Sequence, residues 1–99
     1  MKPENQVKKS IKDLLAYLHI FNFHVLQGLG SRRGICDRIA IYKGQFIAIE
    51  TKAKGRKPSE AQVEFLREVE EAGGISIVAY SPDDIIEALG LQDRFLDLK

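Results

Sequence analysis

The sequence has no tryptophan, only one cysteine and no apolar run long enough to cross a membrane. The single cysteine, Cys36, cannot form an internal disulfide, which argues against the cross-linked scaffolds of small secreted proteins. The N-terminus lacks the apolar stretch of a secretory signal, and a membrane-spanning helix would need roughly 18 consecutive apolar residues. We therefore expect no membrane partner and a cytoplasmic location.

A chain of 99 residues, 44% of them hydrophobic, is suited to one core rather than two. We therefore expect a single domain over residues 1–99. A core of this size is thin, and association of two copies is a common way to extend it. The apolar tail from Leu91 to Leu98 would be exposed on a monomer unless it folds back. We expect a symmetric homodimer, with this tail as a candidate interface.

The net charge of +1 hides two regions of opposite sign. Residues 31–57 hold eight Lys and Arg against two acids, whereas residues 58–99 hold three against ten. A polyanion such as DNA would bind the basic segment, with the acidic end turned away. A solvated surface would explain the basic residues alone, but the acids Asp37 and Glu50 lie among them. The candidate DNA-binding side chains are Arg32, Arg33, Lys54, Arg56 and Lys57.

The spacing of apolar residues predicts the element order α-β-β-β-α-β-α. The expected elements are a helix from Pro3 to about Phe21, strands over 23–26, 35–42 and 46–52, a helix from Ser59, a strand over 75–80 and a helix that stops near Gly90. The strands joined by the tight turn at Lys43-Gly44 must be antiparallel, and the last strand can lie parallel to its neighbour. The prediction is a mixed sheet flanked by helices on both faces.

The tight turn at Lys43-Gly44 sets a register between the two strands that it joins. Side chains alternate between the faces of a sheet, so every second residue counted from the turn lies on one face. That face is apolar near the turn and ends in two opposed carboxylates, with Lys52 two residues further on. The expected pairs are Ile41 with Phe46, Ile39 with Ala48, and Asp37 with Glu50.

Opposed carboxylates repel each other, so an apolar hairpin that ends in Asp37 and Glu50 needs a reason. A divalent cation is the simplest one, because Mg²⁺ takes oxygen ligands and needs only one or two carboxylates. It would activate water and stabilise charge on a phosphoryl oxygen, while Lys52 orients or deprotonates that water. The backbone carbonyl of Thr51 would add a ligand. An acidic rim paired with Lys52 explains the spacing equally well, and a one-residue bulge would move Asp37 to the other face.

The run Gly34-Ile35-Cys36-Asp37, followed by Ile47 to Lys52, resembles the D…(D/E)-x-K signature of the PD-(D/E)XK nuclease superfamily. More closely, residues 4–84 resemble the virus-type replication-repair nuclease family, VRR-NUC. The order of the motifs on these elements makes the likeness specific. Its further parts are Glu4 before the first apolar stripe, Arg32-Arg33-Gly34 before Asp37, Lys54-Gly55, Gln62 on the second helix and Gly73-Gly74 before the last strand.

The resemblance implies an α/β fold with the αβββαβ core of restriction-endonuclease-like proteins, and phosphodiester hydrolysis that depends on Mg²⁺ or Mn²⁺. It implies that Asp37 and Glu50 are metal ligands and that Lys52 is the catalytic lysine. Glu4 and Gln62 would be supporting site residues. Short stand-alone members of the family act on branched DNA as homodimers. The expected function is a structure-specific endodeoxyribonuclease for branched DNA, four-way (Holliday) junctions in particular.

The sequence leaves three alternatives open. A general or restriction-like nuclease would use the same chemistry, a nucleic-acid-binding module would keep the fold without catalysis, and a structural oligomer would carry an incidental acidic rim. The supporting residues also have plain explanations. Glu4 suits the first turn of a helix because of the helix dipole, and Gln62 completes a capping box with Ser59.

Overall fold

The computed structural model describes residues 1–28 and 31–92. Its elements are α1 (Pro3–Tyr17), β1 (Phe21–His24), β2 (Arg38–Tyr42), β3 (Gln45–Thr51), α2 (Glu60–Glu71), β4 (Ile75–Ala79) and α3 (Pro82–Ala88). The four strands form one sheet in the order β1-β2-β3-β4, antiparallel except for the parallel pair β3–β4. This confirms the predicted α/β fold, its element order and its mixed sheet. The single domain over 1–99 stays a prediction.

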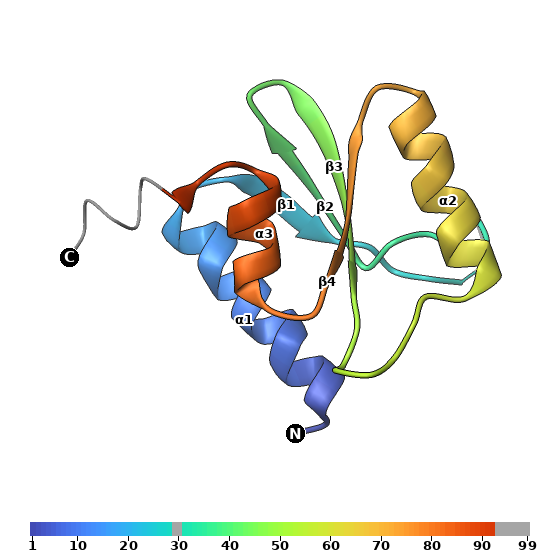
Figure 1. Cartoon of the computed structure of the whole chain (residues 1–99), viewed down its shortest axis with the longest axis horizontal. Coiled ribbons are helices and arrows are strands. Elements are labelled where there is room, and N and C mark those ends of the chain that lie inside the picture. The colour runs from blue at the N-terminus through green and yellow to red at the C-terminus, as the bar shows by residue number, and fades with distance from the viewer. Residues whose placement is uncertain (29–30, 93–99) are drawn as a thin grey trace.

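The helices cover both faces of the sheet, with α1 and α3 on one face and α2 on the other (Figure 1). The face under α1 and α3 carries the larger core, in which Ile11, Ile47 and Ile85 are fully buried. The face under α2 carries a smaller cluster of buried residues, namely Cys36, Ala48, Phe65 and Leu66. No helix among the described residues is long and apolar enough to span a membrane.

The hairpin between β2 and β3 has the predicted register close to its turn. Lys43 and Gly44 both have positive φ, 51° and 77°, which fits a two-residue turn that follows the twist of the strands. This confirms the register that alternation predicts near the turn. The observed pairs there are Tyr42 with Gln45, Ile41 with Phe46, and Ile39 with Ala48.

The first helix is shorter than predicted, because α1 ends at Tyr17 rather than near Phe21. His19 reverses the chain with a φ of 56°, which leaves Phe21 free to begin β1. Leu18 and Ile20 in this turn are buried, so the apolar pattern continues beyond the end of the helix. The strand that follows begins at Phe21 and not at residue 23, for the same reason.

The predicted pairing of Asp37 with Glu50 is wrong, because β2 begins only at Arg38. Arg38 is the partner of Ile49, yet the Asp37 N–H also donates to the Ile49 carbonyl oxygen at 3.0 Å. Asp37 and Arg38 therefore both lie opposite Ile49, as in a β-bulge. Cys36 packs in the same cluster as Ala48, which lies on the α2 face. The alternation is thus broken just before the strand starts.

The tail is described only at its beginning, and residues 93–99 lie outside the described residues. Leu91 is 3% exposed and packs in the core under α1 and α3. It therefore folds back onto its own chain and is not available to a partner. The prediction that the tail forms an interface is wrong for Leu91 and untested for the residues beyond it.

Candidate active site

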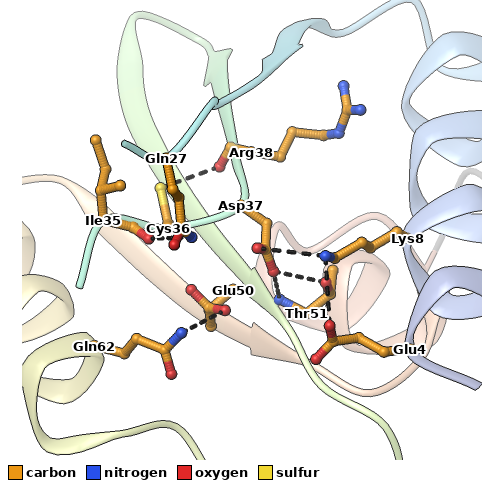
Figure 2. A network of polar contacts seen from close by, with 10 residues as sticks. All are labelled: Glu4, Lys8, Gln27, Ile35, Cys36, Asp37, Arg38, Glu50, Thr51 and Gln62. Atoms are coloured by element: carbon orange, nitrogen blue, oxygen red, sulfur yellow. Dashed lines mark hydrogen bonds and ion pairs between the residues drawn. The ribbon is translucent and has the colours of Figure 1, made fainter. Parts of the chain in front are cut away.

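A pocket of about 360 Å³ opens at the end of the sheet, between α1 and α2 (Figure 2). All five residues that the sequence marks as catalytic or supporting line it, although they come from four separate segments of the chain. The lining residues are Glu4, Lys8, His24, Val25, Gln27, Asp37, Glu50, Lys52 and Gln62. The fold therefore brings the predicted site residues together, whatever their roles.

Asp37 is held at one of its two carboxylate oxygens. The backbone N–H and the hydroxyl of Thr51 both donate to Oδ2, at 2.8 and 2.7 Å. The other oxygen, Oδ1, lies 3.8 Å from the ammonium nitrogen of Lys8, its only ion pair within the described part of the chain. Because Thr51 ends β3, the sheet itself fixes the orientation of this buried carboxylate.

Glu50 is also held at one oxygen, but its other oxygen has no partner. The Gln62 side-chain amide donates to Oε1 at 3.1 Å, whereas Oε2 is buried without a hydrogen bond among the described residues. Burial and the nearby charge of Asp37 raise the pKa of Glu50 to about 8, and Lys52 opposes this shift. The ionised form of this carboxylate is therefore costly in the protein alone.

Gln62 performs both functions that its position allows. Its side-chain oxygen accepts from the backbone N–H of Ser59 at 2.8 Å, and its backbone N–H donates to the Ser59 hydroxyl at 3.2 Å. This is the predicted capping box at the start of α2. The amide nitrogen of the same side chain remains free to donate to Glu50. The cap thus fixes the donor that orients the carboxylate.

The two carboxylates reach the pocket from opposite sides of the sheet end (Figure 2). Asp37 contacts Lys8 of α1 and the side chain of Thr51, whereas Glu50 contacts Gln62 of α2. Neighbouring residues of β3 point to opposite faces, so Thr51 and Glu50 cannot share one. The bulge before β2 therefore replaces a directly opposed pair by two acids that approach a common pocket.

The candidate DNA-binding residues differ in their surroundings. Arg32 forms an ion pair with Glu68, and its guanidinium lies 5.2 Å from the centre of the Phe65 ring. It is therefore already engaged by α2. The other four candidates are exposed. The hydroxyl of Tyr80 donates to the carbonyl oxygen of Arg56 at 2.8 Å, which connects the basic loop to the end of β4. These four are Arg33, Lys54, Arg56 and Lys57.

No family model and no curated protein matches the sequence. Nine chains of solved structures match the fold, among them one named "VRR_NUC domain protein". That match has a TM-score of 0.70 and 21% sequence identity, and it covers 90% of this chain and 86% of the other. The chain has the fold of a VRR_NUC domain protein. The resemblance seen in the sequence is confirmed at the level of the fold.

Within this VRR_NUC fold, the pocket contains residues that the sequence alone did not mark. Lys8 of α1 lines the pocket and the Thr51 hydroxyl holds Asp37, yet neither side chain belongs to the D…E-x-K spacing. The spacing of Glu4 and Lys8, one helical turn apart, was the available signal, because such residues lie on the same face. Their ion pair, at 3.4 Å, confirms that spacing but not a role in the site.

The residues of the pocket fit a divalent cation in part. Among residues 1–28 and 31–92, no group of three or more His, Cys, Asp or Glu side chains is placed to hold a metal ion. Mg²⁺, however, needs only one or two carboxylates and keeps several waters. Glu50 Oε2 has no partner among the described residues, and Asp37 Oδ1 faces only the Lys8 ammonium, at 3.8 Å. Hard oxygen ligands of this kind are the type that Mg²⁺ takes. The carbonyl oxygen of Thr51 as a third ligand stays a prediction.

Proposed function

We propose that this chain is a nuclease of the VRR-NUC type, an endodeoxyribonuclease that depends on Mg²⁺ or Mn²⁺. The observation that carries the proposal is the buried Oε2 of Glu50, which has no partner among the described residues and lies in an open pocket with Asp37 and Lys52. A purely structural acid at this position would be expected to find a donor, since a buried polar atom without a partner costs stability. The VRR_NUC fold supports the same proposal independently.

The residues of the pocket then have distinct tasks. Asp37 Oδ1 and Glu50 Oε2 would hold the cation, which when bound supplies charge stabilisation at a phosphoryl oxygen and a more acidic water. Lys52 places a positive charge in the pocket, where it can orient the attacking water and stabilise the developing negative charge. Thr51 and Gln62 fix the two carboxylates, and Glu4 supports the α1 side of the pocket.

We infer DNA as the substrate from the basic segment that contributes Asp37, Glu50 and Lys52 to the pocket. Residues 31–57 carry eight Lys and Arg against only Asp37 and Glu50, both of which lie inside the pocket. Phosphates are bound mainly by such side chains, without regard to base identity. The sequence has no obvious recognition helix for reading bases, which favours recognition of a DNA structure. We propose branched DNA, four-way junctions in particular, as the preferred substrate.

The working form that we propose is a symmetric homodimer, because paired cuts across a four-way junction need two sites in opposite orientation. A patch of exposed apolar side chains on neighbouring strands β1, β2 and β3 supports contact with a partner. Its members and their exposed fractions are Phe21 (63%), Phe23 (47%), Ile41 (45%) and Phe46 (41%). Light scattering of the wild type, Ile41→Lys and Phe95→Glu separates this patch from the tail, and a monomer that cuts junctions at full rate would exclude the dimer. A cytoplasmic location stays a prediction.

A cleavage assay on labelled duplex, flap, fork and four-way-junction DNA, with Mg²⁺ or with a chelator, tests the function. We expect cleavage only with the metal, and of junctions before duplex. Equal cleavage of every substrate would indicate a general nuclease instead. Binding without cleavage would indicate a nucleic-acid-binding module, and neither binding nor cleavage would leave only a structural role.

A further inference from the structure

Lys8 is a charged residue of the pocket that the proposed chemistry does not use. Its ammonium nitrogen lies 3.4 Å from Glu4 Oε2 and 3.8 Å from Asp37 Oδ1. Figure 2 shows the side chain reaching from α1 to Asp37. Lys9 and Lys12 on the same helix are exposed, whereas Lys8 is half-buried, with a side chain 33% exposed.

A surface ion pair within α1 would explain the contact of Lys8 with Glu4, but not the contact with Asp37. Asp37 belongs to a distant segment, and Lys8 approaches the oxygen that Thr51 leaves open. That oxygen is also the one that Asp37 would offer to a cation. In the protein alone, a lysine therefore lies beside the free oxygen of one carboxylate while the other carboxylate, Glu50, is close by.

We infer that Lys8 is a positioning residue whose ammonium neutralises Asp37 in the metal-free site and leaves Asp37 when a divalent cation binds. The inference rests on the proposed function, since it assumes that the pocket takes such a cation. An ammonium and a divalent cation at the same oxygen would repel each other strongly in a partly buried pocket. The flexible, partly exposed stem of lysine lets the head group move away without a change of the helix.

Calorimetric titration of the metal-free protein with Mn²⁺ tests this inference without reference to cleavage. Lys8→Met keeps the apolar stem and removes the charge, so the variant should bind Mn²⁺ about fivefold more tightly, because no cation has to leave Asp37. Lys8→Arg keeps a cation and should stay near the wild type. Lys12→Met is the matched control, since it removes the same charge from an exposed position on the same helix.

The metal-free melting temperature provides a second measurement. Lys8→Met should melt lower than Lys12→Met, because the negative charge of Asp37 loses its counter-ion. Added Mn²⁺ should narrow this difference, since the cation then replaces the lost charge and binding stabilises the folded state. A third measurement uses the wild type itself, in which the NMR signal of the Lys8 ammonium should shift as Mg²⁺ is added.

The outcomes separate the two proposals. Mn²⁺ binding by the wild type, with the same affinity in Lys8→Met and Lys12→Met, would overturn the role of Lys8 and leave the proposed function standing. Weaker binding by Lys8→Met, or a Lys8 ammonium signal that Mg²⁺ does not change, would overturn it as well. A wild type that binds no Mn²⁺ at millimolar concentration would overturn both proposals together.

Discussion

Asp37 and Glu50 lie in one pocket, yet the surrounding chain satisfies them very differently. Asp37 accepts two hydrogen bonds from Thr51 and faces the ammonium of Lys8. Glu50 is only 2% exposed and accepts one hydrogen bond from Gln62, and its other, buried oxygen has no partner within residues 1–28 and 31–92. One acid is thus held by the sheet and by a lysine, and the other is held by a single amide.

This difference indicates that, in the metal-free pocket, Glu50 is the carboxylate whose ionised form costs more free energy. Burying a charge without enough compensating partners costs free energy, and the raised pKa of Glu50 expresses that cost. Asp37 has the donors that stabilise its ionised form. A cation in the pocket should therefore relieve Glu50 more than Asp37, and the variants below test that asymmetry.

The largest expected effect is one that both acids share. Asp37→Asn, Glu50→Gln and Lys52→Ala should each lower the cleavage rate on the order of 1000-fold, and double variants should lose little more, because residues that act as a unit are not additive. Single-turnover cleavage of a four-way junction measures this. A variant that keeps near-normal cleavage would remove its residue from the site.

Replacing Glu50 and replacing Asp37 should change the free energy of unfolding in opposite directions. The folded chain keeps the Glu50 proton up to a pKa of about 8, whereas an unfolded glutamate loses it near its ordinary pKa of 4.5. The metal-free wild type should therefore lose stability as the pH rises through this window, because its folded state binds more protons than its unfolded state. Glu50→Gln cannot show this loss and should be more stable above pH 8, by at most about 5 kcal/mol.

Asp37→Asn is the matched variant for that experiment and should change stability in the opposite direction. It keeps an acceptor for Thr51 but gives up the charge that strengthens those hydrogen bonds, so we expect a loss of about 1 kcal/mol. Urea unfolding from pH 4 to pH 9 without metal measures both variants. If the free energy of unfolding changed with pH in the same way for the wild type and Glu50→Gln, the proposed difference between the two acids would be contradicted.

The α2 side of the pocket can be disturbed on its own through Gly34. Gly34 has a φ of 78°, and a Cβ there would lie 2.2 Å from the carbonyl oxygen of Ala61 in the first turn of α2. Gly34→Ala should cost about 3 kcal/mol from backbone strain and the clash together. It should also weaken metal binding, because Gln62 moves with the helix. Gly55→Ala is the control, with a φ of 85° and nothing within 4 Å of its Cβ, and should show only the strain.

Smaller changes compare the supports of the two acids directly. Thr51→Val keeps the shape of the side chain and removes the hydroxyl donor of Asp37, which should cost about 1.5 kcal/mol. Ser59→Ala removes the hydroxyl that accepts from the backbone N–H of Gln62, the residue that supports Glu50, and should cost about 1 kcal/mol. Thermal unfolding measures both. A larger loss for Ser59→Ala than for Thr51→Val would reverse the order of support proposed for the two acids.

The smallest expected effect is a change in the salt dependence of DNA binding. It distinguishes the residues that bind phosphates from the residues that bind the cation. Each lost phosphate contact should flatten the log–log salt dependence of duplex binding by roughly 0.9, so Arg33→Ala and Lys54→Ala should each show a change of that size. Arg32→Ala should show less, since α2 already engages its guanidinium. Glu50→Gln should leave the slope unchanged. An unchanged slope for Arg33→Ala or Lys54→Ala would remove that residue from the DNA-binding surface.

The order of the elements and the register near the hairpin turn followed from the amino-acid sequence by itself. Apolar periods, the Lys43-Gly44 turn and the Ser59–Gln62 capping box act between neighbouring residues, so a local pattern is enough to predict them. The same is true of the D…E-x-K spacing, which marks the candidate residues without placing them.

Only the tertiary structure decided how those residues meet. The bulge before β2 turns Asp37 toward Thr51, 14 residues away in the chain, and Lys8 of α1 reaches the same carboxylate. The exact end of α1 and the engagement of Arg32 by α2 were also invisible in the sequence. Each depends on contacts between segments far apart in the chain, for which no local period exists. The free oxygen of Glu50 has the same origin, because its surroundings come from two elements that only the fold brings together.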